Sequence, residues 1–279
     1  MKSVIETIKN EKGIIIAFGI LFTFALCCWL YFDTTKDFGL NFFTEMLGAA
    51  ITVLILDQLI KRREERKNIP LKLAIYEDVR LYTSRYISFW KQTYLDSVPE
   101  PVPENVTVFF SEQGMSKIIY YLYMDSEPNV APRRYWWDYI IQNAKEFNEN
   151  GDKILNRYSH NLEPEVFKYI HQLTESDFNR TLLMIPAIRQ IDDQHNFPRV
   201  KVLCSYSIEP IKEDYEAIIA LINWCESKFA KLQEHSLSLK RVAIYTPVAE
   251  RILPPKCMIP EEILQKQQNE LLEFRNRTK

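Results

Sequence analysis

The chain has 279 residues, of which 47% are hydrophobic and 13% aromatic, and its formal net charge is −2. This composition excludes global disorder and leaves room for one or two domains with a real core. A charge so close to neutral also excludes a nucleic-acid binder that works through its overall field. Any basic function must therefore be local, and six cations do cluster between Lys61 and Lys72.

Two apolar stretches near the N-terminus predict a transmembrane hairpin over residues 13–60. The first, 13–32, is twenty residues without a charge, and the second runs from Phe38 to Ile60. A helix of twenty residues spans about 30 Å of hydrocarbon. Only "DTTKD" separates the stretches, so the two helices must be antiparallel. A cleaved signal peptide is the alternative, but the first apolar stretch is too long and no A-x-A site follows it.

The distribution of cations predicts the orientation of the hairpin. Lys2, Lys9 and Lys12 lie in the N-terminal segment 1–12, and Lys36 is the one cation between the spans. By the positive-inside rule both termini are cytoplasmic, which predicts a multi-pass protein of the inner (plasma) membrane. The cations after the second span are expected to bind anionic lipid headgroups. They are Lys61, Arg62, Arg63, Arg66 and Lys67.

Polar residues inside the spans predict where the helices pack. Asp57 lies four residues before Lys61 and is expected to pair with it at the interface. Glu45 lies about 10 Å inside the second span, where a charge is costly. It is either protonated, paired with the Trp29 indole or facing a partner subunit. Its face serves in hairpin packing, an oligomer contact or a water-filled path. That face contains Glu45, Gly48 and Thr52, and the matching face of the first span contains Gly19, Thr23 and Cys27.

The run from Phe42 to Lys67 resembles the second span of a loose set of mostly uncharacterised bacterial two-transmembrane-helix proteins. The resemblance covers about a tenth of the chain and implies a membrane-tethered cytoplasmic helical domain, not an activity. Some of these proteins look like components of bacterial defence or stress systems. The matching residues are Glu45, Leu47, Gly48, Thr52, Val53, Asp57, Arg62, Arg63 and Glu64.

The sequence after the two spans predicts a cytoplasmic antiparallel helical bundle over residues 99–246. A basic connecting helix within 61–98 precedes it. The connecting helix is expected to start at Pro70 and to end near Leu95. Its apolar stripe contains Leu71, Ile75, Val79, Tyr82, Tyr86 and Phe89. Apolar residues at steps of three and four predict two long helices, 140–158 and 211–232. Gly151 lies on the apolar face of the first and predicts a close helix contact. Shorter helices are expected from Pro164 to Leu173 and from a Ser176 cap to just before Pro186.

Two segments alternate like strands, and the C-terminal segment is set apart by prolines. Residues 105–110 and 199–208 either pair as a minor two-stranded element or form loops.

The tail, 247–279, is proline-rich and then polar and helical; it is either a mobile end or a partner-binding helix. The predicted fold class is therefore mainly α, a transmembrane hairpin followed by a helical bundle, with or without the two-stranded element.

No catalytic motif or cofactor-binding motif occurs in the sequence. The five cysteines lack C-x-x-C spacing and companion histidines, which predicts reduced structural cysteines and no metal site. Asp192, Asp193 and His195 form the best candidate cluster for proton transfer or a cation, but a run of adjacent polar residues before Pro198 is typical of a solvated loop, which is the leading interpretation. His160 and His171 match no ligand spacing and are expected to be core or surface residues.

A basic aromatic run at 132–139 suggests a partner patch made of Arg133, Arg134 and Trp136. The leading interpretation of this run is nevertheless a buried aromatic anchor with surface arginines, and no nucleic acid is expected. The leading functional hypothesis is a non-enzymatic sensor or scaffold at the inner leaflet, with a protein partner or a homo-oligomer. The alternatives are an oligomeric pore-forming effector and an enzyme with an unrecognised site.

Overall fold

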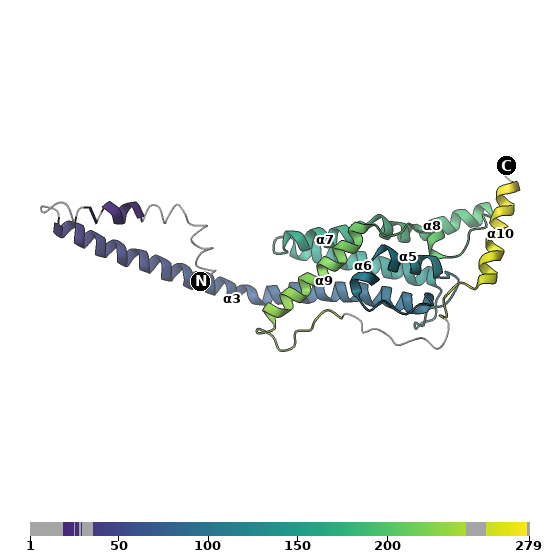
Figure 1. Ribbon diagram of the computed structural model, residues 1–279, viewed down its shortest axis with the longest axis horizontal. Helices are drawn as coiled ribbons and strands as arrows, with labels where there is room; N and C mark the ends of the chain where they lie inside the picture. The colour runs from purple at the N-terminus through teal and green to yellow at the C-terminus, as the bar shows by residue number, and fades with distance from the viewer. Residues whose placement is uncertain (1–18, 25, 28, 30–35, 244–254, 278–279) are drawn as a thin grey trace. The chain divides into compact units, whose positions relative to one another are not determined.

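The protein is mainly helical in a computed structural model that describes residues 19–24, 26, 27, 29, 36–243 and 255–277 (Figure 1). The chain divides into two compact units, Met1–Pro70 and Leu71–Lys279. We call the second unit the helical body. No strand occurs in the described ranges. The labelled helices are α3 (Lys36–Ser97), α4 (Val106–Phe109), α5 (Glu112–Tyr121), α6 (Trp136–Tyr158), α7 (Pro164–Thr174), α8 (Asp177–His195), η2 (Leu203–Ser205), α9 (Lys212–Leu232) and α10 (Glu261–Arg277).

The first unit contains a short helical segment and the first half of α3. Residues 19–24, 26, 27 and 29 are helical, whereas the rest of the predicted first span lies outside the described residues. Phe22 meets Phe43 edge to face with ring centroids 5.3 Å apart, and Phe24 meets Phe42 at 6.5 Å. Among the described helices, α3 is the one with a stretch long and apolar enough to cross a membrane, and none of that stretch is buried.

Pro70 does not start a helix, contrary to the sequence prediction. Helix α3 runs through it, and the boundary between the two compact units falls at this residue. A proline inside a helix removes one backbone hydrogen bond and costs about 3 kcal/mol. The helix nevertheless continues, and the predicted apolar stripe after Pro70 is correct. Ile75, Val79 and Tyr82 are buried.

The helical body packs its helices pairwise around one main hydrophobic core (Figure 1). Helix α6 lies against α7 and α8, and α7 lies against α9. The two long amphipathic helices predicted from periodicity are confirmed as α6 and α9, and Ser176 caps α8 as expected. Six of the largest fully buried side chains are Trp136, Tyr76, Tyr94, Phe109, Ile87 and Met115.

The two segments that alternate like strands, 105–110 and 199–208, do not pair with each other. Residues 106–109 form a helical turn, because the Asn105 side chain accepts a hydrogen bond from the Thr107 N–H at 2.8 Å and caps it. In the second segment Val202 forms an isolated antiparallel bridge with Tyr123, and a 3₁₀ turn follows at once. Side-chain capping thus overrode the alternating pattern in the first segment.

Helix α8 extends nine residues past the predicted stop at Pro186 and ends at His195. Leu182 and Ile185 are buried on the N-terminal side of the proline. Near its C-terminal end, Asp192 is held by Arg199. Asn196 then terminates the helix in the left-handed conformation, with φ of 49°. Packing at both ends outweighs the single hydrogen bond that the proline removes.

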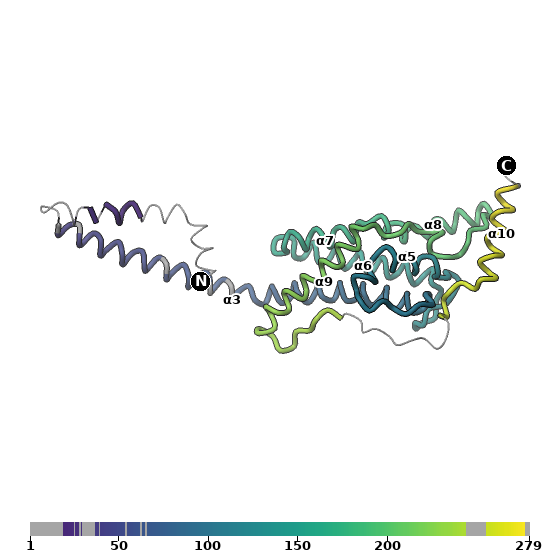
Figure 2. The backbone as a smooth tube through the Cα atoms, in the orientation of Figure 1, coloured from purple at the N-terminus to yellow at the C-terminus, as the bar shows by residue number. Residues whose placement is uncertain are grey.

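The C-terminal helix α10 lies against the segment that follows α8 (Figure 2). Its narrow apolar stripe, Ile263, Leu264 and Leu271, packs against the small cluster around Val200 and Val202. The Gln267 side chain accepts a hydrogen bond from the Lys201 N–H at 2.9 Å. The predicted tail helix is therefore present, and its apolar stripe is covered by the chain itself.

Candidate functional site

The helical body contains a cleft between α3 and α6. Its volume is about 590 Å³, within the range of pockets that hold small ligands, roughly 300–1,000 Å³. Residues 81–92 of α3 form one wall and residues 139–150 of α6 the other. Asn179 and Leu182 of α8, both buried, line the base. All of these residues belong to the helical body.

Aromatic rings line both walls, because the spacing of large side chains places them on one face of each helix. Tyr82 stacks on Phe147 with ring centroids 4.3 Å apart, and Tyr86 lies 4.7 Å from the same ring. Phe89 and Tyr139 face each other across 5.8 Å. All of these except Tyr82 are only partly buried. The cleft therefore offers ring surface to a molecule that enters it.

The rim of the cleft is polar and carries one cation without a partner. Arg85 is exposed on α3 and makes no hydrogen bond or ion pair with any residue that the structure describes. On the opposite wall Glu146 accepts a hydrogen bond from the Gln142 amide at 2.7 Å. The guanidinium of Arg85 thus keeps all of its N–H donors available at the mouth of the cleft.

Three further polar groups line the cleft with unused hydrogen-bonding capacity. The Tyr82 hydroxyl is buried without a partner in the described part of the chain, and burial raises its pKa well above the usual value for tyrosine. Asn143 donates from its amide nitrogen to the Tyr139 carbonyl at 2.8 Å, and no contact of its amide oxygen is seen in the described part of the chain. Asn150 makes no side-chain hydrogen bond there. Of these three groups only the Tyr82 hydroxyl is fully buried, whereas Asn143 and Asn150 are partly exposed.

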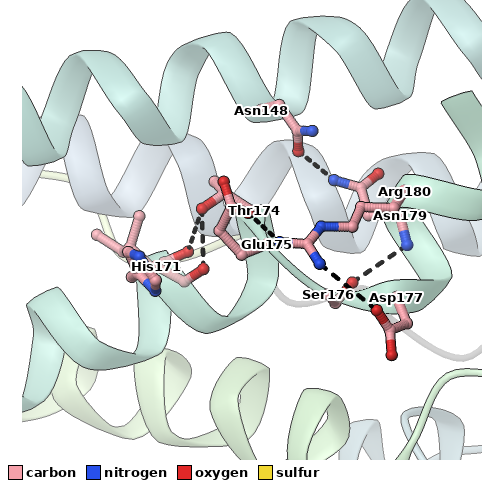
Figure 3. A network of polar contacts seen from close by, with 9 residues as sticks. Asn148, His171, Thr174, Glu175, Ser176, Asp177, Asn179 and Arg180 are labelled. Atoms are coloured by element: carbon pink, nitrogen blue, oxygen red, sulfur yellow. Dashed lines mark hydrogen bonds and ion pairs between the residues drawn. The ribbon is translucent and has the colours of Figure 1, made fainter.

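A polar corner between α7 and α8 positions the base of the cleft (Figure 3). The Ser176 hydroxyl accepts a hydrogen bond from the Asn179 N–H at 3.2 Å, and the Asn179 amide donates to Asn148 of α6. Arg180 donates to the Glu175 carboxylate, and this bond lowers the pKa of Glu175. These contacts join the ends of α7 and α8 to α6 and fix Asn179 in place.

A buried carboxyl group lies at the start of α9, within electrostatic reach of the cleft wall. Asp214 is 4% exposed, and neither carboxylate oxygen has a hydrogen-bond partner among the residues that the structure describes. Burial raises its pKa to about 6, although the nearby Ile211 N–H lowers it in part. Burial, and after it the charge of Asp214, raises the pKa of Tyr86.

The cations expected to bind lipid lie in the first half of α3. Lys61 pairs with Asp57 at 2.7 Å, the contact expected from their spacing. Arg63, Arg66 and Lys67 are exposed, and Arg62 belongs to the same helix. An exposed group of cations can reach a surface outside the chain, and their binding to lipid stays a prediction.

The small-residue faces of the first unit do not make the expected close contact. A methyl group added at Gly19 or Gly48 would have no described atom within 4 Å. The helical segments in this unit touch through bulky phenylalanine rings instead. Thr23 and Thr52 donate to the carbonyls of Gly19 and Gly48 on their own helices, each at 2.8 Å. Glu45 is exposed and has no partner among the described residues, Trp29 included.

The predicted partner patch at 133–136 is wrong in one of its three residues. Trp136 is fully buried, and its ring packs 5.4 Å from that of Tyr139. Arg133 is exposed, while Arg134 donates to Gln142 of α6. Helix α6 begins at Trp136, and its first residues pack into the core. The run is therefore a core anchor with surface arginines.

The candidate catalytic cluster after Ile191 lies in the last turns of α8 and not in a solvated loop. Its three side chains do not point to a common site. Asp192 is buried and receives two hydrogen bonds from Arg199, at 2.7 and 3.0 Å. Arg199 also donates to the Ser205 carbonyl at 2.9 Å. Asp193 and His195 are exposed on α8. The cluster therefore ties the end of α8 to the following segment.

The other predicted histidines carry no site. His160 and His171 are exposed, as one of the two expectations had it. No group of three or more histidine, cysteine or acidic side chains that could hold a metal ion lies in the described ranges. Cys225 and Cys257 are buried, and burial raises the pKa of Cys225 to about 12.

Comparison with protein-family models, curated proteins and solved structures finds no match to this chain. The cleft is thus interpreted from its own residues. Sequence reasoning placed Tyr82, Tyr86 and Phe89 on the apolar stripe of α3, but it assigned them to the core. A stripe of large rings is the available signal, and it does not reveal that the facing helix leaves space beside them.

Proposed function

We propose that the chain is a non-enzymatic sensor or scaffold anchored in the inner membrane, with the helical body in the cytoplasm. The observation that carries this proposal is the unburied apolar stretch of α3. Ile51, Leu56 and Ile60 within it are each about half exposed, which is costly in water. A lipid environment removes that cost, and the helix meets the requirement of the lipid interior that backbone hydrogen bonds be made within the chain.

Two further observations support an anchor with two spans. Phe22 contacts Phe43, and Phe24 contacts Phe42. The residue numbers therefore rise along one helical segment as they fall along the other, as in an antiparallel hairpin. Exposed cations follow the second span directly, where they favour retention in the cytoplasm. Each cation near an anionic surface contributes about 1 kcal/mol.

Replacing the five cations by glutamine should give a mixture of two membrane orientations, one with the C-terminus inside and one with it outside. The cations are Lys61, Arg62, Arg63, Arg66 and Lys67. We expect the wild-type C-terminus to be protected from protease added outside spheroplasts. A measurable fraction of the variant should become digestible, because the charge difference that orients the hairpin is lost. Immunoblotting of the C-terminal tag measures both populations.

The matched control removes five exposed cations of the helical body, which should leave the topology unchanged. Release of the wild-type chain from vesicles by carbonate washing, or an unchanged topology of the first variant, would contradict the anchor as proposed. The control positions are Arg133, Lys145, Lys153, Lys168 and Lys231.

A pore-forming effector is the second candidate, and the exposed Glu45 favours it. A carboxylate without a partner on an apolar helix is expensive in lipid unless it faces a polar seam or water. In a pore, Glu45→Ala should abolish ion leakage from vesicles that contain the protein. For a tether the same variant should show the same baseline leakage as the wild type, with Thr44→Ala as a neighbouring control.

A further inference from the structure

We propose that the cleft between α3 and α6 binds a nucleoside monophosphate, that is, a planar heteroaromatic ring joined through a sugar to one phosphate group. The proposal depends on the helical body alone. It therefore stands or falls independently of the membrane anchor.

The walls of the cleft suit a planar ring. Tyr86, Phe89 and Tyr139 are partly buried, so each keeps ring surface that the protein itself does not cover. Stacking of a base on an aromatic side chain stabilises a complex and tolerates any base, because every base has a π face. The rings of the two walls already contact each other, so the ligand would stack on the ring faces that stay open to the cleft.

The charge at the rim suits one phosphate. Arg85 is the one cation among the described residues that line the cleft, and it has no partner there. A guanidinium binds phosphate through two parallel N–H donors, which fixes orientation as well as affinity. Glu146 is the one anion of the lining. A longer polyphosphate would bring further negative charge toward Glu146 without another cation to balance it.

The unpaired polar groups suit the edge of a base. Asn150 is partly buried, makes no side-chain hydrogen bond with the described residues, and supplies an amide with both a donor and an acceptor. Asn143 keeps its amide oxygen for an additional donor. A heteroaromatic base carries donors and acceptors on its edge, whereas a purely hydrocarbon ring would leave these groups unsatisfied.

Binding of nucleoside monophosphates to the purified full-length protein in detergent tests the proposal. Equilibrium dialysis with AMP, GMP, CMP and UMP, each compared with its neutral nucleoside, separates the phosphate contact from the ring contact. These probes are soluble and do not partition into micelles. We expect saturable binding of at least one monophosphate, and weaker binding of the matching nucleoside.

Three variants assign the binding to the cleft. Arg85→Gln should weaken binding of the monophosphate by roughly tenfold or more and leave the nucleoside unchanged. Asn150→Leu should weaken both. Arg133→Gln removes an exposed arginine elsewhere on the body and should change neither. Circular dichroism spectra establish that each variant is folded.

The proposal is overturned if none of the four monophosphates binds saturably. It is equally overturned if Arg85→Gln weakens the nucleoside as much as the monophosphate, or if Arg133→Gln has the same effect as Arg85→Gln. The last result would show general electrostatic attraction instead of a site.

Discussion

Replacing Gly151 by alanine should lower the free energy of unfolding of the helical body by about 2 kcal/mol. A methyl group at this position of α6 would lie 2.2 Å from Cγ2 of Thr174 at the end of α7. Thr174 is buried, and its hydroxyl donates to the carbonyls of Ile170 and His171, so its side chain cannot turn away freely. The steric cost therefore outweighs the gain of about 1 kcal/mol in helix propensity.

A double-mutant cycle with Thr174→Ser isolates this contact. Serine keeps the hydroxyl and its hydrogen bonds but lacks Cγ2, so Gly151→Ala should cost much less in the Thr174→Ser background. Chemical unfolding followed by near-ultraviolet circular dichroism of the detergent-solubilised protein measures all four proteins. Additive effects of the two substitutions would mean that the closeness of α6 to α7 at Gly151 is not the source of the loss.

Gly151 illustrates what the sequence could predict. Its position on a stripe of apolar residues at steps of three and four indicated both the helix and a close approach, and the structure confirms both. The same periodicity located α9. Such patterns work because the energy of burying an amphipathic face depends on spacing within one segment.

The proline predictions failed because the deciding energies are not local. Pro70 and Pro186 each remove one hydrogen bond, and sequence reasoning took each as a helix boundary. Helix α8 continues because Ile185 is buried before its end and Asp192 is bound by Arg199, seven residues further along the chain. Neither contact can be counted before the partner segments are placed.

The candidate site was hidden for a related reason. A cleft depends on how far apart two helices stand, and Tyr86 and Phe147 are typical core residues when each helix is considered alone. Trp136 shows the converse: Arg133 and Arg134 suggested a partner patch that would include it, but its ring is fully buried, as the interpretation of the run as a core anchor expects. Asp214 resembles any acidic residue in the first turn of a helix. Its burial comes from the rest of the body.

Replacing Asp214 by asparagine should stabilise the helical body at neutral pH and remove a pH dependence of its stability. The folded-state pKa of Asp214 is raised from 3.8 to about 6, chiefly by burial. A difference of about two pKa units corresponds to about 3 kcal/mol. The contribution of the protonated carboxyl is fully present below pH 3.8. It is lost as the pH rises, because the unfolded chain then ionises first. Above about pH 6 the penalty is constant.

Thermal unfolding of the full-length protein between pH 4 and pH 8 measures this effect. The wild type should lose stability between about pH 4 and pH 6, and Asp214→Asn should be flatter over that window and more stable at pH 7.5. Glu216→Gln removes an exposed carboxylate on the same helix and should follow the wild-type profile. Equal profiles for Asp214→Asn and the wild type would show that the carboxyl is hydrated in the folded state.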